Sequence, residues 1–151
     1  MENACYHIVS RGNQKQFIFP HDDDLEKLLS IIRKYKLAFK VKIYSYCIMG
    51  NHYHILLDPP DIKALTKLMQ GVNMSYTQYY NYKYNKCGHL WQGRYKSYII
   101  TKNSYMYNCV NYIEYNPVRA NIVDKPESYK WSSYCGRNGL SQDLLLDQIT
   151  L

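Results

Sequence analysis

Hydrophobic and polar positions divide the first hundred residues into short β-rich segments and longer amphipathic stretches. The β-rich segments are ACYHIVS at 4–10, VKIYSYCI at 41–48, HYHILLD at 52–58 and RYKSYIIT at 94–101. Their β-branched and aromatic residues are typical of strands. Between the second and third segments stand Met49, Gly50 and Asn51, and Gly and Asn adopt the backbone angles that a tight hairpin needs. The pattern therefore predicts four strands, two of them joined in a central hairpin.

Three stretches repeat their apolar residues every three or four positions, as the buried face of a helix does. The first follows the acidic run 22–24 and carries Leu25, Leu28, Leu29, Ile32 and Tyr35. The second follows Asp61, a good helix cap, and carries Leu65, Leu68, Met69, Val72 and Tyr76. The third, which Asn103 or Ser104 can cap, carries Tyr105, Met106, Cys109, Val110 and Ile113. We expect an exposed basic loop at 81–88, after the second helix.

The order of these elements is βαββαβ followed by one more helix. This order predicts an α+β fold of the ferredoxin-like type, an antiparallel sheet backed by two helices, with an added C-terminal helix. A length of 151 residues suits a single domain over 1–151, and no internal repeat interrupts it. Near the end, Leu144 to Leu146 suggest a short closing helix or strand.

Composition adds a preference for a polyanionic partner. The formal net charge is +7, and the segment 138–151 contains no Lys or Arg, so the positive charge lies earlier in the chain. Eighteen tyrosines accompany only three Phe and two Trp. Tyrosines interleaved with lysine, as in YTQYYNYKY at 76–84, are typical of surfaces that stack bases, although Tyr can equally replace Phe in a core.

Two compositional features concern the compartment. Five widely spaced cysteines form no CxxC pair and cannot all pair within one chain, so we expect reduced thiols. No apolar run approaches the length of a membrane span, and the first residues lack the pattern of a signal peptide. We therefore expect a cytoplasmic protein.

His52 and His54 are the first candidates for chemistry. Side chains alternate along a strand, so the two imidazoles project from one side while Tyr53 and Ile55 project from the other. Adjacent imidazoles suit a divalent metal ion. The alternative is that they are two half-exposed polar residues at a sheet edge.

Tyr112 and Asn116 are the second pair. Their spacing sets them on one face if the third helix reaches Asn116. Pro117 favours an end of that helix at Asn116, which would then cap a new short helix. Tyr112 flanks the apolar stripe, where a tyrosine can also serve packing alone.

The strings MGNHYHILL at 49–57 and NYIEYNPVRANIV at 111–123 resemble the two signature segments of the single-tyrosine HUH transposases, in particular the REP-associated tyrosine transposases. YHIVSRGN at 6–13, LWQGRYKS at 90–97 and YKWSSY at 129–134 resemble the flanking segments of that family in the same order. The resemblance spans nearly the whole chain. One departure is Gly50, where the family usually has proline.

The resemblance implies that His52 and His54 are metal ligands, that Tyr112 is the nucleophile and that Asn116 is the third protein ligand. It also implies Mg²⁺ or Mn²⁺, a 5′-phosphotyrosine intermediate and single-stranded DNA, such as a hairpin-containing repeat, as the partner. Candidate DNA contacts are Lys83, Lys86, Trp91, Gln92, Arg94 and Lys96.

Two rival functions stay open at this point. A ferredoxin-like sheet with exposed tyrosines can act as a non-catalytic module for single-stranded DNA or RNA. Two imidazoles also suit zinc, and a zinc hydrolase would activate water and would not need Tyr112. The sequence leaves open whether the protein is a monomer or a homodimer.

Overall fold

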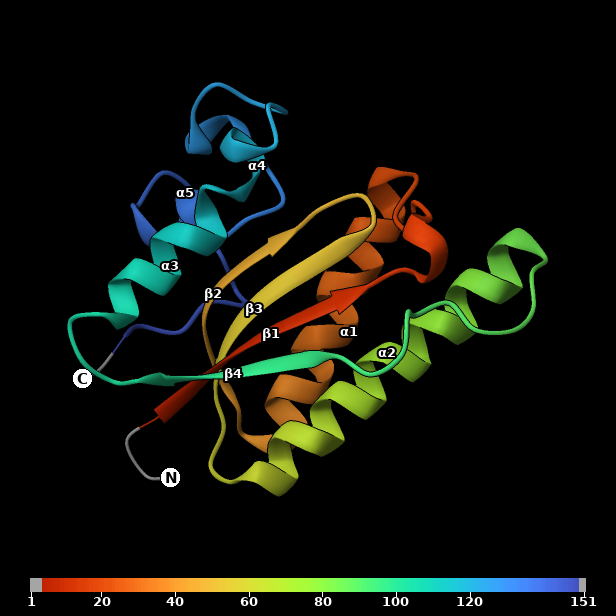
Figure 1. Cartoon of the computed structure of the whole chain (residues 1–151), viewed down its shortest axis with the longest axis horizontal. Coiled ribbons are helices and arrows are strands. Elements are labelled where there is room, and N and C mark those ends of the chain that lie inside the picture. Colours follow the sequence, from red (N-terminus) through yellow and green to blue (C-terminus); the bar gives the residue numbers. More distant parts are fainter. Residues whose placement is uncertain (1–3, 150–151) are drawn as a thin grey trace.

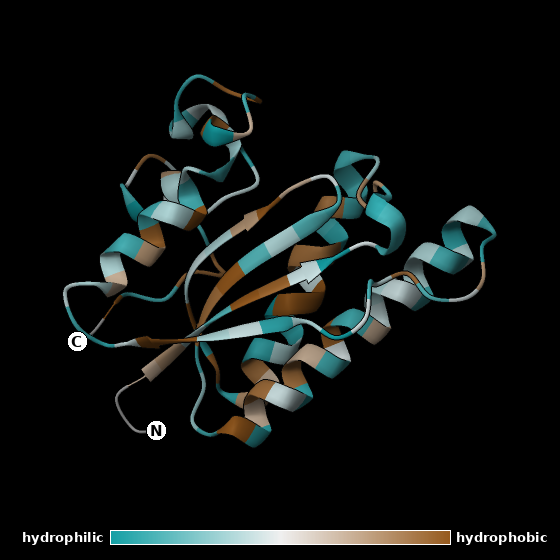
Figure 2. Cartoon of the chain, viewed as in Figure 1, coloured by the Kyte–Doolittle hydropathy of each residue, from teal (hydrophilic) through white to brown (hydrophobic). Residues whose placement is uncertain are grey.

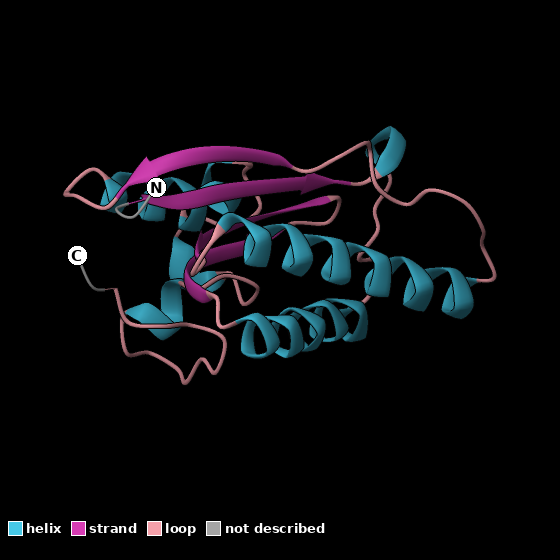
Figure 3. Ribbon diagram, turned by 90° about the horizontal axis from the view of Figure 1, so that it is seen from below, coloured by secondary structure: helices cyan, strands magenta, loops and turns pink. Residues whose placement is uncertain are grey.

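The computed structural model describes residues 4–149. Its antiparallel sheet has the strand order β2-β3-β1-β4 and consists of β1 (Ala4–Arg11), β2 (Lys42–Ile48), β3 (His52–Asp58) and β4 (Lys96–Thr101). The long helices α1 (Asp22–Phe39) and α2 (Ile62–Tyr84) lie side by side along one face of the sheet (Figures 1 and 3). The other helices are α3 (Met106–Glu114), α4 (Asn116–Arg119) and α5 (Tyr134–Arg137), with 3-10 turns η1 (Asn13–Lys15) and η2 (Pro126–Ser128). This topology confirms the predicted ferredoxin-like fold with an added helix.

Side-chain alternation gives each face of the sheet its own core. Ile8, Ile55 and Leu57 point toward α1 and α2, and they are completely buried there. On the other face, α3 packs Met106 and Val110 against the sheet. Figure 2 shows hydrophobic and hydrophilic residues mixed along both the strands and the helices. The sheet therefore separates a two-helix layer from a second, smaller layer built around α3.

Three predicted boundaries were wrong. Helix α2 continues to Tyr84, so half of the expected loop at 81–88 is helical. Helix α3 begins at Met106, and Tyr105 precedes it with 73% of its surface exposed instead of joining the apolar stripe. The segment around Leu145 is neither helix nor strand, and Leu145 is buried as part of an irregular stretch. Tertiary contacts outweighed local periodicity at the end of α2, where Tyr84 donates a hydrogen bond to Asp24 of α1.

Two compositional expectations can be compared with the structure. The five cysteines are free thiols in the described part of the chain, as their spacing predicted. No helix within residues 4–149 combines the length and the apolar character needed to cross a membrane.

A buried carboxylate explains why α2 runs past the expected end. Asp24, in the first turn of α1, is fully buried and accepts hydrogen bonds from the Tyr79 and Tyr84 hydroxyls and from the Lys83 ammonium group. Burial alone would raise the pKa of Asp24, but these bonds and one from the His21 backbone outweigh it and lower the pKa. The end of α2 is therefore tied to the start of α1.

A second buried carboxylate ties α3 to the sheet. Glu114, the last residue of α3, is 1% exposed and accepts hydrogen bonds from Ser133 at 2.5 Å and from Ser45 of β2 at 3.3 Å. The Arg137 guanidinium donates to the same Glu114 oxygen through two nitrogens, each at 2.9 Å. The guanidinium also donates a hydrogen bond to the Tyr44 carbonyl. The register of β2 shifts between Ile43 and Ser45, which turns Ser45 toward α3.

Asp24→Asn tests the first of these networks through its pH dependence. A carboxyl whose pKa is lower in the folded state stabilises the protein above its unfolded pKa of about 3.9 and loses this contribution as the pH falls. We expect the variant to lose about 2 kcal/mol of unfolding free energy at pH 7. Urea unfolding of both proteins at pH 7, 5 and 3 should show this difference shrinking toward pH 3. A difference that is constant with pH would contradict the ionised state assigned to Asp24.

Glu114→Ala tests the second network. Removing one partner of a buried ion pair leaves Arg137 and Ser133 without their acceptor, which should cost about 3 kcal/mol of unfolding free energy. Glu127→Ala is the control, because Glu127 faces Lys125 at 3.9 Å on the surface. This substitution should lower the unfolding free energy by less than about 0.5 kcal/mol. Urea unfolding at neutral pH measures both. Equal losses would show that Glu114 does not anchor α3.

Candidate active site

Strand β3 carries its two histidines on the face of the sheet that α3 covers. The rings of His52 and His54 lie 5.1 Å apart, centre to centre, and meet edge to face. Tyr53, between them, points to the opposite face and donates a hydrogen bond to Asn73 of α2. The expected same-side projection of the two imidazoles is therefore present in the fold.

Both imidazoles are neutral at physiological pH. Burial, reinforced by the positive charge of Arg11, lowers the pKa of His52 to about 4. Burial lowers the pKa of His54 to about 3, and His52, His7, Arg11 and Arg119 add to the effect in that order. A neutral imidazole offers a lone pair, which is the form that binds a metal ion.

A third histidine, which the sequence reasoning missed, completes this cluster. His7 lies on β1, and its Nε2 is 2.9 Å from Nδ1 of His54. The two rings stack at 5.2 Å between centres. Burial lowers the pKa of His7 as well. The signal was available in YHIVSRGN, since a ferredoxin-like order sets the first strand beside the third, but the register that joins the two histidines is a property of the folded sheet.

Tyr112 lies above these histidines within the same chain. Its ring centre is 6.1 Å from that of His54 and 6.0 Å from that of His7. Val110 and Ile113 of the same helix, α3, are buried in the core on this face of the sheet, whereas Tyr112 itself is 52% exposed. The phenol ring thus contacts the histidines of the sheet and remains half exposed to solvent.

Arg119 contacts Tyr112 directly, and the sequence did not indicate this residue as part of the site. Its guanidinium carbon is 4.1 Å from the centre of the Tyr112 ring, within the range of a cation–π contact. The same guanidinium donates a hydrogen bond to the Tyr112 carbonyl. Arg119 therefore restrains Tyr112 and adds a positive charge beside the phenol ring.

Asn116 follows Tyr112 across a break between two helices. Helix α3 ends at Glu114, and the next helix begins at Asn116, so the shared helical face that the spacing allowed is interrupted. The expectation that Asn116 caps the short helix was wrong by one residue, because Tyr115 occupies the cap position. Asn116 is half-buried, four residues after Tyr112.

The donors at this site fit a divalent cation in part. Nδ1 of His52 is 2.7 Å from Oδ1 of Asn51, which leaves Nε2 of His52 open. Within residues 4–149, no group of three or more His, Cys, Asp and Glu side chains is arranged to hold a metal ion. An ion bound by His52 and His54 would therefore need an amide oxygen or water to complete its shell.

The candidate DNA contacts separate into different regions. Lys96 of β4 pairs with Val9 of β1, and its exposed side chain shares the face of the sheet that carries His7. Gln92 and Arg94 are exposed in the segment before β4. Trp91 is half-buried and donates to the Asn73 carbonyl, so it packs beneath this segment. Lys83, in contrast, forms ion pairs with Asp23 and Asp24 at the end of α2.

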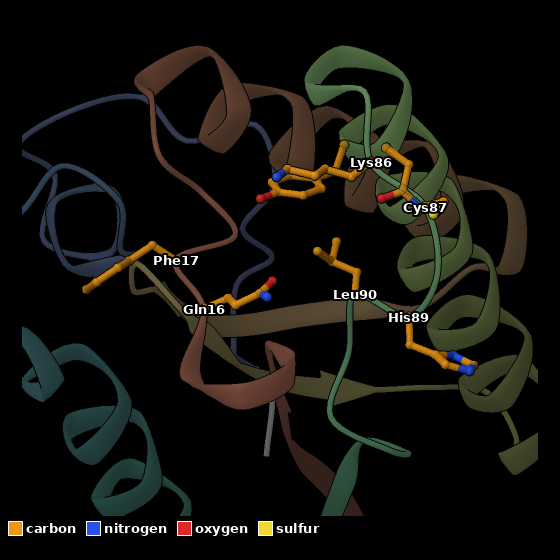
Figure 4. Close-up of a pocket in the computed structure, with 8 residues that line it drawn as sticks. Gln16, Phe17, Lys86, Cys87, His89 and Leu90 are labelled. Carbon is orange, nitrogen blue, oxygen red and sulfur yellow. The ribbon is translucent and has the colours of Figure 1, made fainter.

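Lys86 lies at a cavity between the segment after η1 and the C-terminal end of α2. The cavity measures about 310 Å³ and is lined by Gln16, Phe17, Tyr80, Asn81, Lys86, Cys87, His89 and Leu90 (Figure 4). Figure 4 shows the Phe17 side chain directed away from Leu90. A Cβ atom at Gly50 would come within 2.7 Å of the Phe17 ring. A side chain at position 50 would therefore require the Phe17 ring, which is 72% exposed, to shift.

Three comparisons with known proteins bear on this site. The chain matches the family described as "Transposase IS200 like" over residues 1–116, a segment that includes the three histidines, Tyr112 and Asn116. No curated protein matches the sequence.

Two solved structures share the fold. A REP-associated tyrosine transposase bound to a REP hairpin is 14% identical, with a TM-score of 0.73 over 99% of this chain and 94% of that one. A protein from Deinococcus radiodurans described as a transposase is 17% identical, with a TM-score of 0.52 over 72% of this chain and 85% of that one. Because the family match covers far more than half of the sequence and the fold agrees with it, this chain belongs to the IS200-like transposase family.

Proposed function

We propose that this protein is a metal-dependent nuclease and strand transferase that cuts single-stranded DNA and links it to Tyr112. The observation that carries the proposal is the distance of 6.1 Å between the ring centres of Tyr112 and His54 in one chain. Had the tyrosine and the histidines lain on separate faces, a partner subunit would have had to supply the tyrosine. Since both come from the same chain, we infer that the tyrosine acts in cis.

The chemistry conserves the number of phosphodiester bonds. The Tyr112 oxygen attacks the phosphorus atom as the phenol loses its proton to solvent, and the bond between phosphorus and the 3′ oxygen breaks. The leaving oxygen takes up a proton and becomes a free 3′-hydroxyl, while the 5′ side remains attached to Tyr112 as a phosphotyrosine. A 3′-hydroxyl from another strand can reverse the step, so that joining DNA requires no ATP.

The other residues of the site assist this reaction. His52 and His54, with Asn116, would hold Mg²⁺ or Mn²⁺. When bound, such an ion neutralises charge on a non-bridging phosphate oxygen and orients the phosphate for in-line attack. Arg119, whose guanidinium stacks on the Tyr112 ring, restricts the phenol to one orientation and adds electrostatic attraction for the phosphate.

The substrate is proposed to be DNA with a hairpin and a single-stranded flank. The REP-associated transposase that shares this fold was solved with a REP hairpin, which supports this class of substrate. On this chain, Arg11, Lys96 and Tyr98 share the face that carries the histidines, and all three are exposed. Cations beside an exposed aromatic ring suit a single strand, because they hold phosphates while the ring stacks a base. Lys83 is the weakest of the predicted contacts, since Asp23 and Asp24 already neutralise it.

Tyr112→Phe tests the nucleophile. We expect wild-type protein, incubated with Mn²⁺ and a labelled hairpin oligonucleotide that carries a single-stranded flank, to form an adduct that survives SDS. The phenylalanine variant lacks the attacking oxygen and should form none. Tyr107→Phe is the control, because Tyr107 is an exposed tyrosine of the same helix, and it should form adduct at the wild-type level. Gel electrophoresis of the labelled DNA measures all three.

The outcomes separate the proposal from its rivals. Adduct formed equally by Tyr112→Phe would refute the assignment of the nucleophile. Reversible DNA binding without any adduct would favour the non-catalytic binding module. Cleavage by Tyr112→Phe with zinc, and without adduct, would favour a zinc hydrolase.

Metal removal tests the proposed role of the histidines. Treatment with EDTA should abolish adduct formation, and Mg²⁺ or Mn²⁺ should restore it, because both imidazoles are neutral and able to bind an ion near pH 7. His54→Ala should remain inactive after metal is returned, with a loss of at least about 100-fold. His89→Ala removes an exposed histidine that does not belong to the His7, His52 and His54 cluster, and it should behave as wild type. Full activity of His54→Ala would remove the metal from the proposal.

A further inference from the structure

His7 is in closer contact with His54 than a packing role requires. The two ring nitrogens are 2.9 Å apart, which is a hydrogen-bond distance, and the rings stack. His7 is only 9% exposed, and its ring lies 5.8 Å from that of Tyr98 and 6.0 Å from that of Tyr112. Three aromatic rings therefore contact the His7 imidazole.

This contact limits how His54 can bind an ion. Nδ1 of His54 faces His7, so only Nε2 can point to a metal. A neutral imidazole carries its hydrogen on one nitrogen, and the other nitrogen holds the lone pair. For Nε2 to be the ligand, Nδ1 must carry the hydrogen and must donate it to an acceptor. Nε2 of His7 is the atom in position to accept it.

The opposite arrangement would disable the site. If His7 donated to Nδ1 of His54, the hydrogen of His54 would lie on Nε2, and this nitrogen would have no lone pair to offer. His52 does not face this ambiguity, because Nδ1 of His52 meets Oδ1 of Asn51, an atom that can only accept. Both imidazoles of β3 then share one pattern, with Nδ1 donating to the protein and Nε2 free.

We propose that His7 is a positioning residue that accepts a hydrogen bond from His54 and thereby selects the tautomer in which Nε2 of His54 can bind a metal ion. Partners of this kind orient ligands, and their loss typically weakens metal binding by about 10- to 100-fold. The inference rests on the proposed function in one respect, namely that His54 is a metal ligand. The tautomer itself is a property of the metal-free protein.

Nitrogen-15 NMR of the metal-free protein tests the tautomer directly. Long-range correlations between the ring nitrogens and carbon-bound hydrogens should show His54 protonated on Nδ1 in the wild type. His7→Gln should preserve this state, because its amide oxygen can accept the same hydrogen bond. His7→Leu removes the acceptor and should transfer part or all of the population to the other tautomer. A wild-type His54 protonated on Nε2 would overturn the proposal.

Titration with Mn²⁺ alone, followed by electron paramagnetic resonance, tests the consequence for binding. His7→Leu should bind about 10- to 100-fold more weakly than wild type, and His7→Gln should remain within a few-fold of it. His89→Leu is the control for loss of a histidine elsewhere. Far-UV circular dichroism and urea unfolding establish that each variant is folded. If the leucine variant does not fold, the comparison of wild type with His7→Gln still tests the proposal, because a large loss of Mn²⁺ affinity in the glutamine variant would contradict it.

The two proposals fail in different ways. Equal Mn²⁺ affinity of wild type and folded His7→Leu would refute the role of His7 while leaving the nuclease intact. An absence of Mn²⁺ binding in the wild type, together with Nδ1 protonation of His54, would refute the metal site while the hydrogen bond to His7 remains. Tight binding by wild type and His7→Gln with weak binding by His7→Leu is the result that we expect.

Discussion

The carboxylate of Glu114 joins segments that are far apart in the sequence, and the geometry of the site depends on this contact. Ser45 belongs to the sheet, Ser133 and Arg137 to the C-terminal region, and all three donate to Glu114 at the end of α3. Because Tyr112 is two residues earlier on the same helix, anchoring Glu114 also determines where the phenol lies. Apolar packing alone would allow a short helix to slide or rotate on the sheet, whereas a buried ion pair with several hydrogen bonds has one favourable arrangement.

Charge has two roles on the face that Tyr112 and the histidines share. Burial lowers the pKa of His54, and Arg11 and Arg119 add to this effect, which keeps the imidazole neutral with a lone pair available. In the proposed function, the same guanidinium groups attract a phosphate. The proposed site therefore combines neutral nitrogen donors for a cation at its centre with positive side chains around them. The net charge of +7 does not by itself show where positive charge is available for a partner. Lys83, for example, is neutralised by Asp23 and Asp24 in the layer of α1 and α2.

The sequence by itself determined the order of the elements and the chemistry of the main candidates. Apolar periodicity located all four strands and the three main helices, because burial of one face imposes a period of two on a strand and about 3.6 on a helix. The period of two also implied that His52 and His54 share a face. Helix ends were less predictable, and Tyr84 shows why, since a hydrogen bond to Asp24 some sixty positions away holds the last turn of α2.

Only the tertiary structure decided which residues meet around Tyr112. His7 and Arg119 lie far from β3 in the sequence and reach it through the register of β1 and through the turn after α3. Neither residue has a local sequence pattern that predicts its partner. The hydrogen bond between His7 and His54, for example, requires the two nitrogens to be placed to within a few tenths of an ångström, and strand pairing and packing together determine that placement. Periodicity determines the face on which a side chain lies, whereas the packing of separate segments determines what that side chain touches.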